Sequence, residues 1–130
     1  MAEQDYWDFA NTVYPEREKV ADYLAPLARL FSPGRTVVDL ACGRGEFLHV
    51  LAGLGHKTVG VDTSRHSQEL CAAAGIPFHR MDVVEFLESS PTRYDALFSY
   101  GFLEHLLPAD FERLFQAMGR NCPQGAEVVF

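Results

Sequence analysis

Three aspartates, each at or just after the end of a short apolar run, are the residues of this sequence best suited to bind a ligand. Asp39 precedes Gly43 and Gly45, and Asp62 and Asp82 follow the next two runs. A carboxylate at a strand tip can reach a cationic amine, and glycines let a ligand approach the backbone closely. An acid about 20 residues beyond such glycines can accept hydrogen bonds from both hydroxyls of a ribose. This order predicts a site for a nucleotide-like ligand.

Such residues need a framework of strands and helices, and the hydrophobic pattern predicts one. Short apolar runs predict strands at Thr36–Leu40, Thr58–Val61, Pro77–Arg80, Ala96–Tyr100 and Glu127–Phe130. Helical periodicity lies between them, at about Glu46–Leu54, Ser64–Ala74, Val83–Ser89 and Ala109–Asn121. Strands that alternate with helices favour a parallel sheet with right-handed crossovers, whose carboxyl edge binds ligands.

The glycine turn resembles the first motif of class I S-adenosylmethionine (SAM)-dependent methyltransferases, acid-x-Gly-x-Gly-x-Gly. Asp39, Gly43 and Gly45 match the motif, and Ala41 replaces its first glycine. The replacement is a mild departure provided that the position does not need a positive φ. The resemblance implies a Rossmann-like three-layer α/β/α fold with strand order 3-2-1-4-5, lacking the usual last two strands. It also implies SAM as the methyl donor and S-adenosylhomocysteine (SAH) as the product.

The same resemblance assigns roles after the second and third strands. Asp62 would bind the ribose hydroxyls, with Thr63 and Ser64 beside the adenine edge. Asp82 would accept a hydrogen bond from the adenine amino group, with Met81 and Val83 against the ring. A helix N-cap is the alternative role for residues 62–64, because Asp, Thr and Ser all favour that position, and both roles can coexist.

Residues 94–106 resemble the fourth strand and following turn of the family, where the acid-histidine pair here is Glu104–His105. Ser99 and Tyr100 would end a central strand beside the transferred methyl group. His105 and Tyr100 are the candidate catalytic residues, since imidazole titrates near neutral pH. Ordering of the loop and cofactor pocket is the alternative role for His105, so the general base stays open.

Methyl transfer is an in-line displacement at a carbon that the sulfonium already activates, so the protein mainly aligns donor and acceptor. Alignment contributes up to ~7–11 kcal/mol in ideal cases. The expected acceptor is a small metabolite, a carbohydrate or a biosynthetic intermediate. Residues 39–48 and 60–62 bear a weaker likeness to bacterial methyltransferases that modify polysaccharides. A cofactor motif does not identify the acceptor.

The segment before the first strand, residues 1–35, predicts one or two helices ahead of a SAM-binding domain at 36–130. Its apolar stripe favours packing on the sheet. Four aromatic residues are candidates for a lid over the cofactor, because a sulfonium is attracted to aromatic faces, with ordinary packing as the alternative. These are Tyr6, Trp7, Phe9 and Tyr14, the last also a candidate cofactor contact.

Composition narrows the class of partner. The 130-residue chain carries 18 acids against 11 bases, a net charge of −7, without the basic patch typical of nucleic-acid enzymes. A small molecule is therefore the expected substrate. No secretory signal or membrane span is evident, and no cysteine–histidine spacing indicates a metal. Three cysteines predict reduced thiols and a cytoplasmic location. Cys42, in the glycine turn, fits a small buried side chain at the cofactor better than a nucleophile.

The end of the sequence resembles the turn and fifth strand of the family fold. A strand that stops there leaves an apolar edge, which we expect a C-terminal domain, a partner chain or a second copy to cover. The 130 residues alone could then be inactive. A SAM-binding module without catalysis is thus the alternative function. A nicotinamide-dependent oxidoreductase fits worse, because Leu48 stands where its third glycine should fall.

Overall fold

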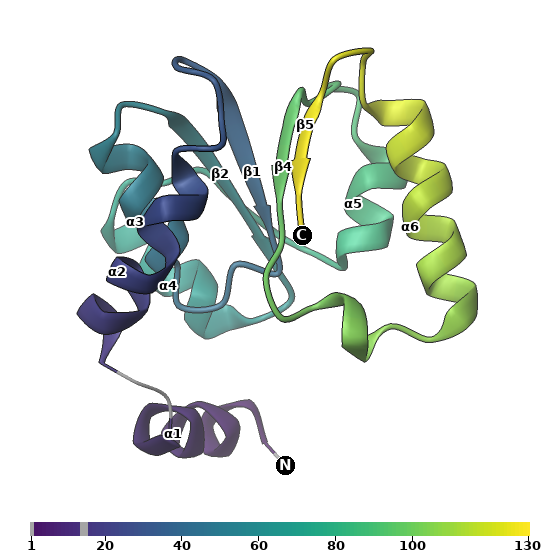
Figure 1. Ribbon diagram of the computed structural model, residues 1–130. Coiled ribbons are helices and arrows are strands. Elements are labelled where there is room, and N and C mark those ends of the chain that lie inside the picture. Colours follow the sequence, from purple (N-terminus) through teal and green to yellow (C-terminus); the bar gives the residue numbers. More distant parts are fainter. Residues whose placement is uncertain (1, 14–15) are drawn as a thin grey trace.

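The computed structural model describes residues 2–13 and 16–130 and contains a five-stranded, wholly parallel sheet of order β3-β2-β1-β4-β5 (Figure 1). The strands are β1 (Thr36–Leu40), β2 (Lys57–Asp62), β3 (Phe78–Arg80), β4 (Ala96–Phe98) and β5 (Glu127–Val129). The helices are α1 (Glu3–Val13), α2 (Arg17–Ala28), α3 (Glu46–Gly53), α4 (Arg65–Ala73), α5 (Val83–Ser89), the short 3₁₀ helix η1 (Leu103–His105) and α6 (Pro108–Asn121). The predicted three-layer architecture and strand order are confirmed.

β1 lies at the centre of the sheet, and its side chains enter a core on each face. On one face Val38 and Leu40 pack with residues of α5 and α6. On the other face Val37 packs with residues of α2 and α3, including Phe47. A strand buried on both faces needs a nearly continuous apolar sequence, and this is why Thr36–Leu40 carries one acid only, at Asp39.

The direction of the crossovers creates a crevice beside β1. The chain runs from β1 outward to β2 and β3, then returns across the sheet to β4 and β5. The connections after β1 and β4 therefore diverge at the carboxyl edge of two neighbouring strands, where open α/β sheets bind ligands. In Figure 1 this edge lies at the bottom, and α1 runs beneath it.

The opposite edge of the sheet is held by charged side chains. Arg35 Nη1 lies 2.5 Å from Asp95 Oδ2, and Arg35 Nη2 lies 3.7 Å from Glu127 Oε1. Ser32 donates its backbone N–H and its hydroxyl to the same Glu127 carboxylate. These contacts join the residues just before β1, β4 and the start of β5, and so stabilise the sheet away from the crevice.

The largest difference from the predicted elements is at the fourth strand. It was expected over Ala96–Tyr100 and ends at Phe98, so Ser99 and Tyr100 belong to the following loop. Pairing with β1 and β5 stops at Phe98, and Gly101 turns the chain with a φ of 67°. This turn directs the loop toward η1. Across residues 2–13 and 16–130, none of the helices is both long and apolar enough to cross a bilayer.

Candidate functional site

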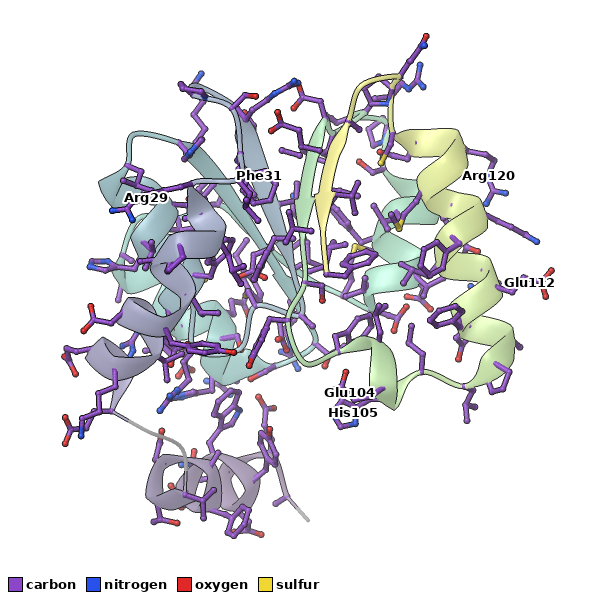
Figure 2. All side chains as sticks on the ribbon, viewed as in Figure 1. Arg29, Phe31, Glu104, His105, Glu112 and Arg120 are labelled. Atoms are coloured by element: carbon purple, nitrogen blue, oxygen red, sulfur yellow. The ribbon has the colours of Figure 1, made fainter. Side chains whose placement is uncertain are left out.

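A cavity of about 1060 Å³ opens at the carboxyl edge of the sheet. Its walls come from the turn after β1, residues 62–64 after β2, the loop after β4, and parts of α1 and α2. This is the crevice that the topology predicts. Figure 2 shows Glu104 and His105 together on η1 at this edge, whereas Glu112 and Arg120 project from α6 into solvent.

The turn after β1 is built from left-handed backbone. Ala41 and Cys42 both donate their N–H groups to Val61 O, at 2.8 and 3.1 Å. Gly43 has a φ of 53° and Gly45 a φ of 76°, which glycine adopts without strain. Ala41 has a φ of 63° and is the single non-glycine residue with a positive φ in the described part of the chain. The replacement of glycine by alanine was expected to be mild only without a positive φ, and that condition is not met. The left-handed backbone at Ala41 costs roughly 1–2 kcal/mol of strain.

Asp62 connects the first turn with the second. Its Oδ2 accepts a hydrogen bond from Gly43 N at 2.9 Å, and its Oδ1 accepts one from Ser64 N at 2.9 Å. The carboxylate thus spans two loops that are far apart in sequence. Each carboxylate oxygen keeps a second lone pair, so the group can also accept hydrogen bonds from a ligand in the cavity.

Asp39 is a buried acid without a partner. It is 3 % exposed, lines the cavity, and has no hydrogen bond or ion pair with any residue in 2–13 or 16–130. Burial raises the pKa of its carboxyl well above the ordinary value, and the negative charge of Asp62 raises it further. A ligand cation beside Asp39 would offset both effects and favour the ionised form. This site therefore fits a positively charged group.

α1 is attached to the start of α4 through Ser64. Trp7 Nε1 donates to Ser64 Oγ at 3.0 Å, and Ser64 donates its hydroxyl to Glu3 Oε1 at 2.7 Å. Ser64 Oγ also accepts from Ser67 N and caps α4, so the N-cap role expected for residues 62–64 falls to Ser64. Trp7 is buried and lines the cavity. Its indole, one of the four aromatic lid candidates, forms part of the wall.

The other end of the cavity is more open. Tyr23 of α2 and Tyr100 after β4 meet with ring centroids 6.1 Å apart, and both line the cavity. They remain 65 % and 54 % exposed. A hydrogen bond between the two hydroxyls raises the pKa of Tyr100. His105 also lines this end and is exposed, next to Glu104.

The structure brings most of the predicted site residues to one cavity. Those that line it are Asp39, Ala41, Cys42, Gly43, Asp62, Thr63, Tyr100 and His105. Five others do not line it: Gly45, Met81, Asp82, Val83 and Ser99. Tyr14 lies outside the described residues, as does Pro15.

The residues outside the cavity have structural contacts that account for their places. Asp82 Oδ1 accepts from Val84 N and Glu85 N, at 2.8 and 3.0 Å, and caps α5. Val83 is buried in the core between the sheet and α5. Ser99 donates its hydroxyl to Leu40 O at 2.7 Å and joins β4 to β1. Their predicted contacts with a cofactor stay predictions.

Several cavity residues were not among the predicted site residues, and Glu3, Lys19 and Tyr23 are three of these. Tyr23 belongs to an apolar stripe of α2, which favours packing, and no local signal marks it as exposed to a ligand. Glu3 and Lys19 look like ordinary surface charges in the sequence. Within the described ranges no group of three or more His, Cys, Asp or Glu side chains could hold a metal ion.

Comparison with known proteins identifies the family. Residues 13–130 match the methyltransferase domain family, so the chain belongs to that family. A crystal structure of a SAM-dependent methyltransferase from Archaeoglobus fulgidus superimposes with a TM-score of 0.78 at 27% identity. The match covers 96% of this chain and 54% of that one. The fold is therefore the Rossmann-like fold of SAM-dependent methyltransferases.

Two further relatives indicate how far the likeness extends. The ubiquinone biosynthesis O-methyltransferase of Paracidovorax citrulli is 28% identical, over 96% of this chain and 55% of its own length. The cyclopropane-fatty-acyl-phospholipid synthase of Escherichia coli strain K12 is 23% identical, over 92% of this chain and 32% of its own length. The chain thus spans about a third to a half of the curated relatives it matches.

Proposed function

We propose that this chain is the cofactor-binding part of a SAM-dependent methyltransferase. The observation that carries the proposal is the pair of acids in the cavity. Asp39 is buried near the end of β1 and has no polar partner among the residues that the structure describes, and Asp62 holds the glycine turn from the end of β2. Asp39 suits a cationic amine, which SAM carries in its amino acid portion. Asp62 suits vicinal hydroxyls, which SAM carries on its ribose.

The residues present fit such a cofactor. Gly43 has no Cβ, and open space surrounds the position where one would lie, so a ligand can approach the backbone of the turn. Asp39 would hold the amine and Asp62 the ribose, with Thr63 beside the base and Trp7 in the wall. SAM, when bound, supplies an electrophilic methyl group. The contribution of this chain is then to bind, orient and exclude water.

The open end of the cavity is the proposed site of the acceptor. Tyr23 and Tyr100 present aromatic faces and hydroxyls there, and His105 lies at the same end, where it would accept a proton from a hydroxyl or amine. The acceptor is proposed to be a small molecule or a carbohydrate. A sugar N-methyltransferase from Streptoalloteichus has this fold, with a TM-score of 0.69 at 24% identity over 95% of this chain and 52% of its own.

Three further features belong to the same proposal. Residues 1–35 act as a lid segment, supported by the Trp7–Ser64 contact. A C-terminal domain, a partner chain or a second copy covers the edge of β5, where Val128 and Phe130 are exposed. Three free thiols favour the reducing environment of the cytoplasm.

Calorimetric titration with SAM, SAH and NAD tests the proposal. We expect SAM and SAH to bind with similar affinity and NAD not to bind. Binding of NAD without SAM would overturn it in favour of an oxidoreductase. Lys57→Ala, at the opposite edge of the sheet, is the control for nonspecific charge effects.

The alternative is a SAM-binding module without catalysis. Full-length protein that retains SAM but transfers no methyl group to a panel of sugars, phenols and amines would favour it. In an active full-length protein, His105→Ala and Tyr100→Phe should lower kcat with little change in SAM affinity. A kcat unchanged in both variants would remove these residues from the reaction.

A further inference from the structure

Two cysteines that are distant in sequence belong to one small buried cluster beside the glycine turn. Cys42 lies in the turn and Cys71 in α4, and both pack with Leu48 in one small cluster. They are 8 % and 2 % exposed. Each thiol shifts the pKa of the other. The third cysteine, Cys122, packs on the opposite face of the sheet with the α5–α6 core.

The two thiols differ in acidity and in access. The Cys42 thiol lowers the pKa of the Cys71 thiol, and the positive charge of Arg17 acts in the same direction. The Cys71 thiol and burial raise the pKa of the Cys42 thiol. Cys42 lines the cavity, so a small oxidant in the cavity reaches the pair through it. An acidic thiol beside a second thiol is the arrangement from which disulfides form.

We propose that Cys42 and Cys71 are a reversible dithiol–disulfide modification site that controls the glycine turn. The oxidant is a hydroperoxide. One cysteine sulfur attacks the peroxide, the O–O bond breaks, and a sulfenic acid and an alcohol (water, for hydrogen peroxide) are formed. The second sulfur displaces the hydroxyl, which leaves as water with the remaining thiol proton. Two thiols and one hydroperoxide thus give one disulfide, one alcohol and one water.

The disulfide would displace the turn rather than the helix. An S–S bond is about 2.05 Å long, much shorter than the distance between two sulfur atoms that are not bonded, so one cysteine has to move. Cys71 is held within α4, whereas Cys42 is followed by Gly43 and then Gly45. Cys42 is already tightly packed, since its Sγ lies 3.1 Å from where a Cβ on Gly60 would be.

A shift of Cys42 acts directly on the cavity. The next amide, Gly43 N–H, donates to Asp62 Oδ2, so movement of the turn misaligns the carboxylate assigned to the ribose. We expect oxidation to weaken SAM and SAH binding by about tenfold. This effect rests on the proposed function, whereas formation of the disulfide does not.

The experiment uses Cys122→Ser protein, so that no third thiol competes. Hydrogen peroxide is added in small excess, and peptides are mapped by mass spectrometry without reduction, while SAH affinity is measured by calorimetry. We expect one disulfide joining residues 42 and 71, a tenfold loss of SAH affinity, and recovery of both with dithiothreitol. Cys71→Ala in the same background should bind SAH normally and lose the response to peroxide.

Three other results are possible, and each contradicts a different claim. Peptides that contain sulfinic acid or intermolecular disulfides instead of the 42–71 link would overturn the proposal, and this readout needs no variant at position 71. A 42–71 disulfide with unchanged SAH affinity would overturn the control of the turn. If the reduced protein binds no SAH, the proposed function is contradicted and no effect of oxidation on SAH affinity can occur. The peptide map still decides whether the disulfide forms.

Discussion

The two ends of the cavity are built by different means. At the end formed by β1 and β2, Val61 O accepts two N–H groups of the glycine turn, and Asp62 accepts one from Gly43 and one from Ser64, so the backbone is closely held. At the end formed by the loop after β4, Tyr23 and Tyr100 are more than half exposed, and their rings meet edge to face. One end is preorganised and the other is free to adapt.

This contrast matches the demands of a transferase. A binding site that always receives the same ligand gains affinity from rigid, prealigned groups. A site whose ligand differs between relatives is better placed on exposed loops, which tolerate change. We therefore expect substitutions at the first end to change cofactor affinity and substitutions at the second end to leave it nearly unchanged.

The largest effect should come from Asp62→Ala. The variant loses the carboxylate that braces Gly43 and Ser64 and would bind the ribose, so SAH affinity should fall by about a hundredfold, or ~2.7 kcal/mol. Isothermal titration calorimetry measures the dissociation constant for SAH. Glu69→Ala, an exposed acid on α4, is the matched control and should bind normally. An affinity within twofold of wild type would place Asp62 outside the site.

Asp39→Asn should weaken SAH binding by about tenfold and at the same time stabilise the protein. The folded state raises the pKa of Asp39, so it holds a proton that the unfolded chain releases above about pH 3.9. The stability that this group contributes is therefore lost as pH rises from there through the folded pKa. Asn does not titrate, so its gain over wild type should grow from mildly acidic to neutral pH.

Urea unfolding of wild type and Asp39→Asn across that pH range measures the difference in their free energy of unfolding. A gain that is independent of pH would contradict the raised pKa. In wild type, SAH affinity should itself increase with pH, because the ligand's amine binds the ionised carboxylate.

Asp82 tests whether the rigid end extends to β3. Asp82→Ala removes the cap of α5 and should cost about 1 kcal/mol of unfolding free energy. Asp82→Ser keeps a capping oxygen but loses the charged contact predicted for adenine. A normal SAH affinity in both variants would limit Asp82 to the cap, whereas a loss in both would assign it to the cofactor.

Ala41→Gly should stabilise the rigid end by about 0.5–1 kcal/mol. Glycine relieves roughly 1–2 kcal/mol of left-handed strain in the folded state. Part of this gain is lost because glycine also raises the conformational entropy of the unfolded chain. Thermal unfolding measures the gain. Ala52→Gly, in helix α3, is the control and should lose about 1 kcal/mol. A destabilised Ala41→Gly would show that the alanine methyl contributes more than its strain costs.

The smallest effect is expected at the adaptable end. Tyr23→Phe removes one exposed hydroxyl and its hydrogen bond to Tyr100, so stability should change by less than about 0.5 kcal/mol. SAH affinity should stay within twofold. A large loss of SAH affinity would break the comparison and extend the rigid cofactor region to α2.

The predictions made from sequence succeeded where local pattern and fold agree. The short apolar run Thr36–Leu40 predicted a strand, and β1 has these bounds in the structure. The run is nearly continuous because a parallel strand covered on both faces needs apolar residues. Asp39, Gly43 and Asp62 were assigned to one site from their order along the chain, and all three line the same cavity. Topology makes this possible, since every parallel strand ends at the same edge.

The errors arose where a neighbouring segment decides the outcome. Ala41 seemed a mild replacement, and its positive φ follows from the two bonds that Val61 O accepts in the next strand. β4 ended at Phe98, the last of its residues in register with β1 and β5, and Gly101 then turns the chain. Tyr23 seemed a packing residue, because its helical stripe does not tell which side faces a cavity.

By itself, the sequence determined the order of strands and helices, the acids and glycines at the strand ends, and hence the family. These features are local, since periodicity and turn residues act over a few neighbours. Only the tertiary structure decided that Asp39 is left without a polar partner among the described residues, that Trp7 joins Ser64, and that Cys42 and Cys71 share one buried cluster. Such contacts join elements distant in the chain, and their formation depends on how crossovers and helices pack around the sheet.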